Sequence, residues 1–212
     1  ARENLAALLT DIQQNTRKIK EHGKRADNIV KAMLLHSRGK KDEKRRTQIN
    51  EMLEEYVQLS YHGMRAHDSS FNIELDVHLD PALPELEVVP QDLARVFLNI
   101  LNNGCYAAHE RKQQLGASFH PKLTVSTALE SDKVVIRIRD NGSGIDEGIQ
   151  DKVFTPFFTT KPAGVGTGLG LSISYDIVVQ EHQGELSVQS VPGEYTEFII
   201  VLPTGTTNRS EG

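Results

Sequence analysis

The sequence predicts an α+β protein in which one long helix precedes an α/β sandwich, a mixed sheet of about five strands covered by helices on one face. Three observations lead to this prediction. Residues 4–37 contain no proline and repeat apolar side chains every seven positions. After a charged break, segments with helical periodicity of apolar residues are mixed with segments in which every second residue is apolar. Mixed elements of this kind pack as layers around one core.

The composition is that of a soluble globular protein, with 38% hydrophobic and 25% charged residues among 212. The net charge of −5, without a basic stripe interleaved with aromatics, argues against nucleic acid as a partner. The single cysteine, Cys105, is expected to be a buried thiol in a reducing compartment. No apolar run approaches the roughly 18 residues that span a bilayer. We therefore expect a cytoplasmic part of a protein, and a membrane anchor upstream stays open.

The first segment, residues 1–38, is predicted to hold one helix from about Asn4 to Ser37, roughly 50 Å long at 1.5 Å per residue. Its apolar stripe needs other helices to bury it, and no second helix of matching length follows. We therefore expect a homodimer through residues 1–38. His22 and His36 lie on or beside the stripe, and we interpret them as packed or capping residues because no acid follows either one. The repeat consists of Leu5, Ile12, Ile19, Ala26 and Met33.

Residues 47–203 are predicted as one domain between a charged linker, 39–46, and a polar tail, 204–212. Helices are predicted where apolar residues recur every three or four positions, at Ile49 to about Gly63, from Pro90 onward, at Glu147 to Val153 and at Leu169 to Glu181. Strands are predicted where apolar and polar residues alternate, at Phe71–Leu79, Leu123–Leu129, Val134–Arg139, Glu185–Ser190 and Thr196–Leu202. A loop is expected from Thr155 to Gly168.

The turn after the third predicted strand, Asp140 to Ile145, places a carboxylate at a strand end beside Gly142 and Gly144. A hydrogen-bond acceptor beside a backbone that a ligand can approach suits an adenine amino group. A calcium loop is excluded, because its third and fifth positions would be these two glycines. A glycine-rich turn without a ligand stays open as the alternative.

Two further features point to phosphate and metal. Asn99 and Asn103 are four residues apart, so both amides lie on one helix face and could serve Mg²⁺, or could be exposed polar residues. From Gly164 to Leu171 every second residue is glycine, and a helix follows, so backbone amides could surround phosphate oxygens. This stretch is neither a Walker loop nor a dinucleotide fingerprint.

Four motifs in order resemble the N, G1, F and G2 boxes of the sensor histidine kinases. They are Asn99…Asn103, Asp140-Asn141-Gly142-Ser143-Gly144-Ile145, Phe154-Thr155-Pro156-Phe157-Phe158-Thr159-Thr160-Lys161 and Gly166-Thr167-Gly168-Leu169-Gly170-Leu171. The resemblance covers about Thr47 to Pro203, and residues 21–30 resemble the second helix of that family's dimerisation hairpin.

The resemblance implies an ATP pocket of the Bergerat fold. Asp140 would contact the adenine amine, Asn103 would bind Mg²⁺, Asn99 would lie on the phosphate and metal side, and Thr159–Gly168 would form a lid. Phe154, Phe157 and Phe158 would anchor this lid. The implied ATP-binding residues are Asn99, Asn103, Asp140, Gly142, Gly144, Ile145, Lys161, Gly166, Thr167, Gly168, Leu169, Gly170, Leu171 and Thr196.

The sequence departs from the family at several positions. Gly104 replaces the usual Ala, Tyr106 stands where many members carry a basic residue, and Gln183 replaces the middle residue of His-Gly-Gly. The acceptor box His-Glu/Asp-x-x-x-Pro is absent, and we interpret His109-Glu110 as coincidental. The phosphoacceptor histidine would therefore lie on a helix outside this chain, and the receiver domain of a response regulator would take the phosphoryl group next.

Related ATP-hydrolysing proteins carry a glutamate where this chain has Asn99. Because an amide cannot accept a proton from water, rapid hydrolysis is disfavoured and the γ-phosphoryl group is kept for another acceptor. Two alternatives remain, a serine/threonine protein kinase of the same GHKL superfamily and a nucleotide-sensing dimerisation scaffold without catalysis.

Overall fold

A computed structural model describes Ile12, Asn15, Thr16, Ile19, Gly23 and residues 43–162 and 166–205. The chain divides into two units, Ala1–Lys41 with Thr155–Leu169 and Asp42–Phe154 with Gly170–Gly212. The five described residues before residue 43 are helical. The rest of the predicted dimerisation stripe, residues 163–165 of the predicted lid and the tail from residue 206 lie outside the described residues.

The larger unit is built on a five-stranded sheet with the order β2-β4-β5-β7-β6. Strand β2 pairs in parallel with β4, and all the other neighbours are antiparallel. The sheet is therefore mixed, as the sequence predicts. Its strands are β2 (Glu74–His78), β4 (Lys122–Glu130), β5 (Lys133–Asp140), β6 (Glu185–Val191) and β7 (Tyr195–Pro203).

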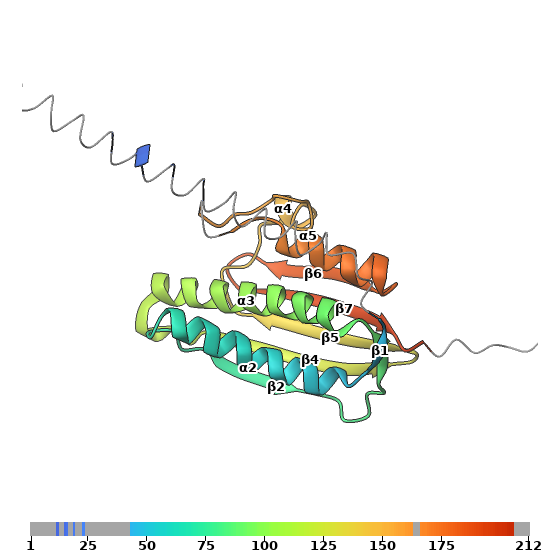
Figure 1. Ribbon diagram of the computed structural model, residues 1–212. Helices are drawn as coiled ribbons and strands as arrows, with labels where there is room; N and C mark the ends of the chain where they lie inside the picture. The colour runs from blue at the N-terminus through green and yellow to red at the C-terminus, as the bar shows by residue number, and fades with distance from the viewer. Residues whose placement is uncertain are drawn as a thin grey trace, which may run out of the picture. The chain divides into compact units, whose positions relative to one another are not determined.

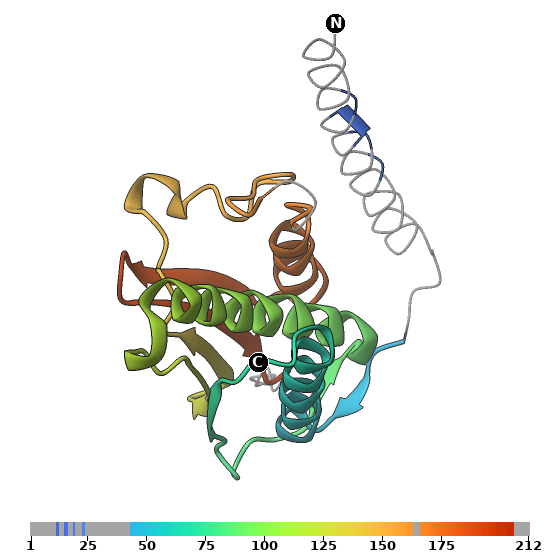
Figure 2. The ribbon, with the colours of Figure 1, turned by 90° about the vertical axis from the view of Figure 1, so that its left-hand side faces the viewer.

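The long helices α2 and α3 lie side by side on one face of this sheet, with α5 beside α3 (Figures 1 and 2). Pro90 occupies the first turn of α3, where its missing N–H has no intrahelical partner to lose. Among the described helices, none has both the length and the apolar composition needed to cross a bilayer. The helical segments are α2 (Ile49–His67), α3 (Pro90–Leu115), η1 (Gly116–Ser118), α4 (Glu147–Gln150), α5 (Gly170–Tyr175) and the π-helix η2 (Asp176–Glu181).

The core lies between the sheet and the apolar faces of α2 and α3. The apolar residues that recur at helical spacing on α3 are all buried, which confirms the 3.6-residue period of that helix; they are Leu93, Val96, Phe97, Ile100, Leu101 and Cys105. Burial of these side chains removes apolar surface from water, which stabilises the fold by about 25 cal/mol per Å² of buried surface. The buried residues at its centre include Leu53, Leu93, Phe97, Ile100, Leu101, Leu123, Ile136 and Ile200.

The structure differs from the predicted elements in several places. Strand β1 (Arg45–Thr47) pairs with β3 (Leu86–Val88), although two of its residues fall in the predicted linker. Helix α2 continues to His67, one turn past Gly63, and β2 begins at Glu74. The predicted short helix ends at Gln150, and the last predicted helix becomes π-helical from Asp176. Three-residue strands are too short to show an alternating pattern, and helix ends depend on tertiary contacts.

Candidate functional site

Asp140, the last residue of β5, is a buried carboxylate with only 3% of its surface exposed. Its Oδ1 accepts the N–H of Gly142 at 2.8 Å. Burial raises the pKa of Asp140 to about 7, because removing the carboxylate from water disfavours its charged form. A buried acid of this kind is suited to accept a hydrogen bond from a ligand.

The glycines of the turn allow close packing of the turn onto the protein. A Cβ on Gly142 would lie 2.7 Å from the Cβ of Ala107 and 2.8 Å from its carbonyl carbon, so the turn touches α3 directly. Gly144 has φ +71°, and a Cβ there would lie 2.3 Å from the carbonyl oxygen of Val191. From the sequence, these two glycines were expected to let a ligand approach the backbone. In the structure they instead let the turn pack against α3 and the β6–β7 turn.

Thr196 and Ser190 continue the site across the sheet. Thr196 is opposite Asp140 in the β5–β7 register and opposite Ser190 in the β6–β7 register. The Ser190 hydroxyl accepts the N–H of Ile145 at 2.8 Å, donates to the Tyr195 carbonyl at 2.7 Å and lies 3.1 Å from Oγ1 of Thr196. Ser190 thus fixes the end of the turn, and the sequence reasoning missed it. Its position opposite Thr196 in the final hairpin was the available signal.

Asn99 lies on α3 and connects that helix to the start of α5. Its side-chain Nδ2 donates to the carbonyl oxygen of Gly170 at 3.1 Å and to the hydroxyl of Ser174 at 3.3 Å. A Cβ on Gly170 would lie 3.3 Å from Asn99 Oδ1, so glycine leaves room for this contact. Asn103 follows one turn later, half-buried on the same helix. The two asparagines therefore share a helix face, as predicted.

The predicted lid residues Lys161, Gly166, Thr167, Gly168 and Leu169 belong to the smaller unit. Inside that unit the two ends of the lid pack on each other. Gly168 has φ +70°, and its carbonyl oxygen accepts the N–H of Phe157 at 2.8 Å. A Cβ on Gly166 would lie 2.5 Å from Oγ1 of Thr159. These glycines allow a tight loop whose ends meet.

The three phenylalanines predicted as one lid anchor divide between the units. Phe154 belongs to the larger unit, where its ring centroid lies 5.4 Å from Tyr175 and 6.4 Å from Phe198. Phe157 and Phe158 belong to the smaller unit, and Phe157 is 49% exposed. Within the larger unit, Phe154 packs against the core.

His182 and Gln183 stand where the sequence departs from the His-Gly-Gly pattern of the family. His182 Nε2 accepts the N–H of Val89, just before α3, at 3.0 Å, and its Nδ1 lies 2.9 Å from the carbonyl of Ile177. Because a carbonyl only accepts, Nδ1 carries the proton. Gln183 has φ +55°, a conformation that favours the glycine usual at this position.

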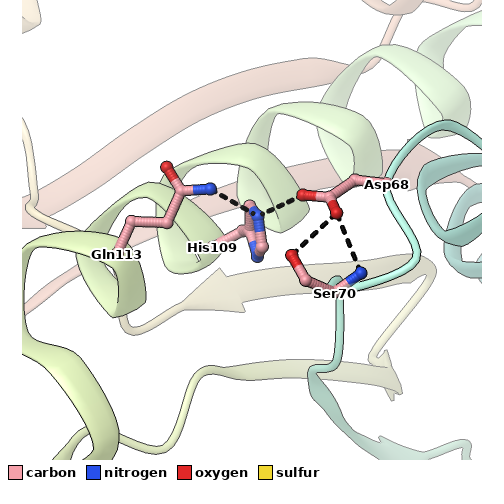
Figure 3. Close-up of polar contacts among 4 residues, drawn as sticks. All are labelled: Asp68, Ser70, His109 and Gln113. Atoms are coloured by element: carbon pink, nitrogen blue, oxygen red, sulfur yellow. Dashed lines mark hydrogen bonds and ion pairs between the residues drawn. The ribbon is translucent and has the colours of Figure 1, made fainter.

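A second polar cluster joins the end of α2 to α3 (Figure 3). His109 Nε2 lies 3.0 Å from Asp68 Oδ2 and 3.0 Å from Gln113 Nε2. The other oxygen of Asp68 accepts both the hydroxyl and the N–H of Ser70, and these bonds hold the pKa of Asp68 below its usual value. Because the serine hydroxyl binds the carboxylate and not the imidazole, the cluster is not a Ser-His-Asp triad.

The single cysteine of the chain is buried, as its composition and position in the sequence predicted. Cys105 is 1% exposed, and burial raises its pKa to about 12, which confirms a buried, unreactive thiol. In residues 43–162 and 166–205, no three His, Cys, Asp or Glu side chains gather closely enough to hold a metal ion.

The fold is a mixed sheet covered by helices on one face. It carries a buried carboxylate at a strand end and two asparagines on the neighbouring helix. This combination defines a nucleotide-binding domain of the ATPase and kinase class. The chain belongs to the histidine kinase-, DNA gyrase B- and HSP90-like ATPase family, whose sequence profile matches residues 88–206. It carries the ATP-binding domain found in sensor histidine kinases, as the resemblance implied.

Curated relatives and structures of known fold agree with this assignment. The histidine-protein kinase AtoS of Escherichia coli K12 is 35% identical over 179 residues, covering 84% of this chain and 27% of AtoS. Sporulation kinase E of Bacillus subtilis 168 is 32% identical over 180 residues, covering 85% of this chain and 22% of that kinase. The nucleotide-free catalytic domain of the histidine kinase ThkA superposes with a TM-score of 0.63 at 27% identity, covering 76% and 96%. The chain thus spans about a quarter of the length of these two kinases.

Proposed function

We propose that this chain is the catalytic part of a sensor histidine kinase. It transfers the γ-phosphoryl group of Mg·ATP to a histidine on a dimerisation helix outside these 212 residues, for relay to an aspartate of a response regulator. The family membership and the names of the relatives support this proposal. AtoS and ThkA are named as histidine kinases, so a serine/threonine kinase is not favoured.

The observation that carries the proposal is the hydrogen bond from Asn99 to the carbonyl oxygen of Gly170. Since a carbonyl only accepts, the amide nitrogen of Asn99 must face it. A carboxylate at position 99 would place an acceptor against an acceptor, so the start of α5 is fitted to an amide. An amide does not deprotonate water, and the site therefore favours transfer of the phosphoryl group over hydrolysis.

The residues present fit Mg·ATP. Asp140 is buried, has one oxygen held by Gly142 and keeps an acceptor for the adenine amine. Asn103 offers the neutral amide oxygen that Mg²⁺ accepts beside phosphates and water. Bound ATP supplies an activated phosphoryl group, and Asn99 holds the start of α5 on the phosphate side. The residues proposed to surround the nucleotide are Asn99, Asn103, Asp140, Gly142, Gly144, Ile145, Lys161, Gly166, Thr167, Gly168, Leu169, Gly170, Leu171 and Thr196.

The proposal includes a homodimer through residues 1–38, a receiver-domain partner and a cytoplasmic location. The seven-residue apolar repeat supports the dimer, because one isolated amphipathic helix leaves its stripe in water. Two-component signalling by the named relatives supports the receiver domain as the next acceptor.

The test is incubation of the chain with γ-labelled Mg·ATP, alone and with a hairpin fragment that carries the acceptor box. We expect acid-labile label on the fragment and none on the chain alone, unchanged by His22→Gln or His36→Gln. Asp140→Asn should abolish labelling. Asp146→Asn is the matched control, because Asp146 is exposed and caps α4 by accepting the N–H of Gly148.

Each alternative has its own outcome in this experiment. Acid-stable label would indicate a serine/threonine kinase, and release of inorganic phosphate without labelled protein would indicate an ATPase. ATP binding without transfer or hydrolysis would indicate the nucleotide-sensing scaffold. Any of these three results would refute histidine phosphotransfer.

A further inference from the structure

Arg111, near the end of α3, connects two turns that are distant in sequence. Its Nη1 donates to the carbonyl oxygens of Asn141 at 2.8 Å, Gly142 at 3.0 Å and Glu194 at 3.1 Å. Its Nη2 donates to the carbonyl oxygen of Gly193. One guanidinium thus holds two carbonyls of the turn after Asp140 and two carbonyls of the β6–β7 turn.

The position of Arg111 follows from the packing of α3. Gly104, Ala107 and Arg111 are spaced i, i+3 and i+7, so they lie on one helix face. A Cβ on Gly104 would lie 3.4 Å from the Cβ of Asp140, and Ala107 touches Gly142. The same face therefore runs along Asp140 and its turn, and Arg111 extends it to the β6–β7 turn.

The chemistry of the guanidinium suits this place. Its planar fork carries five N–H donors, whereas a lysine has three donors on one nitrogen. The guanidinium carbon lies 4.8 Å from the centre of the Phe119 ring, which supports the plane from one side. Among the described contacts of this group no carboxylate takes part, so its donors serve the backbone.

The turn has a separate anchor on its other side. Asn141 Nδ2 donates to the carbonyl of His120 at 2.9 Å, and Asn141 Oδ1 accepts the N–H of Lys122 at 2.8 Å. This side chain fixes the turn to the start of β4. Arg111 fixes the following peptide, and the N–H of Gly142 in turn orients Asp140 Oδ1.

We propose that Arg111 is a positioning residue for adenine recognition, which keeps the Asp140 carboxylate aimed at the 6-amino group by clamping the Asn141–Gly142 backbone to the β6–β7 turn. The inference rests on the proposed ATP site. Loss of the clamp loosens the carboxylate, so recognition of the amino group weakens more than recognition of the rest of the nucleotide.

The experiment compares titrations of the full chain with ATP and with purine riboside 5′-triphosphate, which lacks only the 6-amino group. One charge-assisted hydrogen bond corresponds to a preference for ATP of about 10- to 100-fold. Arg111→Met keeps the apolar stem and removes the donors, and it should reduce this preference to below about threefold. Arg111→Lys should fall between the two. Arg65→Met is the matched control, because Arg65 is exposed on α2 and its guanidinium donates a hydrogen bond to the hydroxyl of Tyr61, in the same helix.

A second readout needs no nucleotide. Hydrogen exchange of the amides of residues 141–144 and 191–195 should become faster in Arg111→Met and stay unchanged in Arg65→Met. If Arg111→Met does not fold, Phe119→Leu serves as the second variant, because it removes only the ring beneath the guanidinium. It should lower the preference for ATP as well, but by a smaller factor than that expected for Arg111→Met.

The possible failures are distinguishable. A wild-type chain that prefers ATP, with the same preference in the Arg111 and Phe119 variants, overturns the positioning role and leaves the proposed function standing. A wild-type chain that binds both triphosphates equally, or neither, refutes the adenine contact of Asp140 and with it the role of Arg111.

Discussion

Asp140→Asn should make the protein more stable while removing its ability to recognise adenine. In the fold, burial raises the pKa of Asp140 from 3.8 to about 7. A shift of this size corresponds to about 4 kcal/mol of unfavourable free energy when the group is charged at pH above 7. An asparagine has no charge to bury, and its amide oxygen can still accept the N–H of Gly142. We expect about 2–4 kcal/mol of stabilisation at pH 8, or roughly 5–10 °C in Tm.

The pH dependence identifies the cause. Between pH 3.8 and about 7 the folded state keeps a proton on Asp140 that the unfolded state has released. The contribution of Asp140 to the stability of the wild type therefore falls as pH rises through this window and levels off above it. The difference in Tm between the variant and the wild type should be small near pH 4, grow up to about pH 7 and then stay constant. Thermal unfolding at pH 4–8 measures it.

The effect on adenine recognition is measured by titration with ATP and with purine riboside 5′-triphosphate. The wild-type preference for ATP over purine riboside triphosphate should decline below pH 7, since the charged carboxylate is a stronger acceptor for the amino group than the protonated acid. The variant should show no preference at any pH. Asp146→Asn, in an exposed helix cap, should change neither curve. A Tm difference that does not vary with pH, or a less stable variant at pH 8, would refute the reasoning from burial.

Three further predictions concern the packing around the site. Asn99→Asp should destabilise the fold by about 1–3 kcal/mol in denaturant unfolding, because an oxygen would then face the Gly170 carbonyl. Gly142→Ala should weaken ATP binding at least about tenfold in titrations and should lower Tm, because the added Cβ would overlap α3. Unchanged ATP binding would contradict the close packing of the turn against α3. Gly184→Ala should cost about 2–4 kcal/mol, because its Cβ would lie 2.3 Å from a carbonyl of β7, whereas Gln183→Gly should stay within about 1 kcal/mol of wild type.

The sequence was sufficient to predict those helices, strands and polar side chains whose positions follow from the spacing of apolar residues. The inward face of α3 follows from the spacing of its apolar residues, and Asn99 and Asn103 share a face because four residues make about one helical turn. Asp140 could be placed at a strand end because Val134, Ile136 and Ile138 alternate with other residues. These inferences depend only on local geometry.

The sequence was insufficient where the contact partner is distant along the chain. Arg111 reads locally as an exposed charge at a helix end, and Ser190 as the polar residue of an alternating strand. Both acquire their roles from turns that lie elsewhere in the sequence. The hydrogen bond from the Val89 N–H to His182, just after the π-helix that begins at Asp176, likewise joins residues distant in the sequence. Local periodicity carries no information about such contacts.

The contacts of the glycines also limit how the site can be tested. Gly142 and Gly144 meet Ala107 and Val191, so a substitution at either one disturbs the fold and the binding surface together. Loss of ATP binding in a glycine variant therefore does not separate ligand contact from packing. Asp140 differs, because its replacement is expected to raise stability while lowering adenine recognition. Opposite changes in stability and binding are the result that packing damage cannot produce, so Asp140 is the position at which function can be assigned independently of folding.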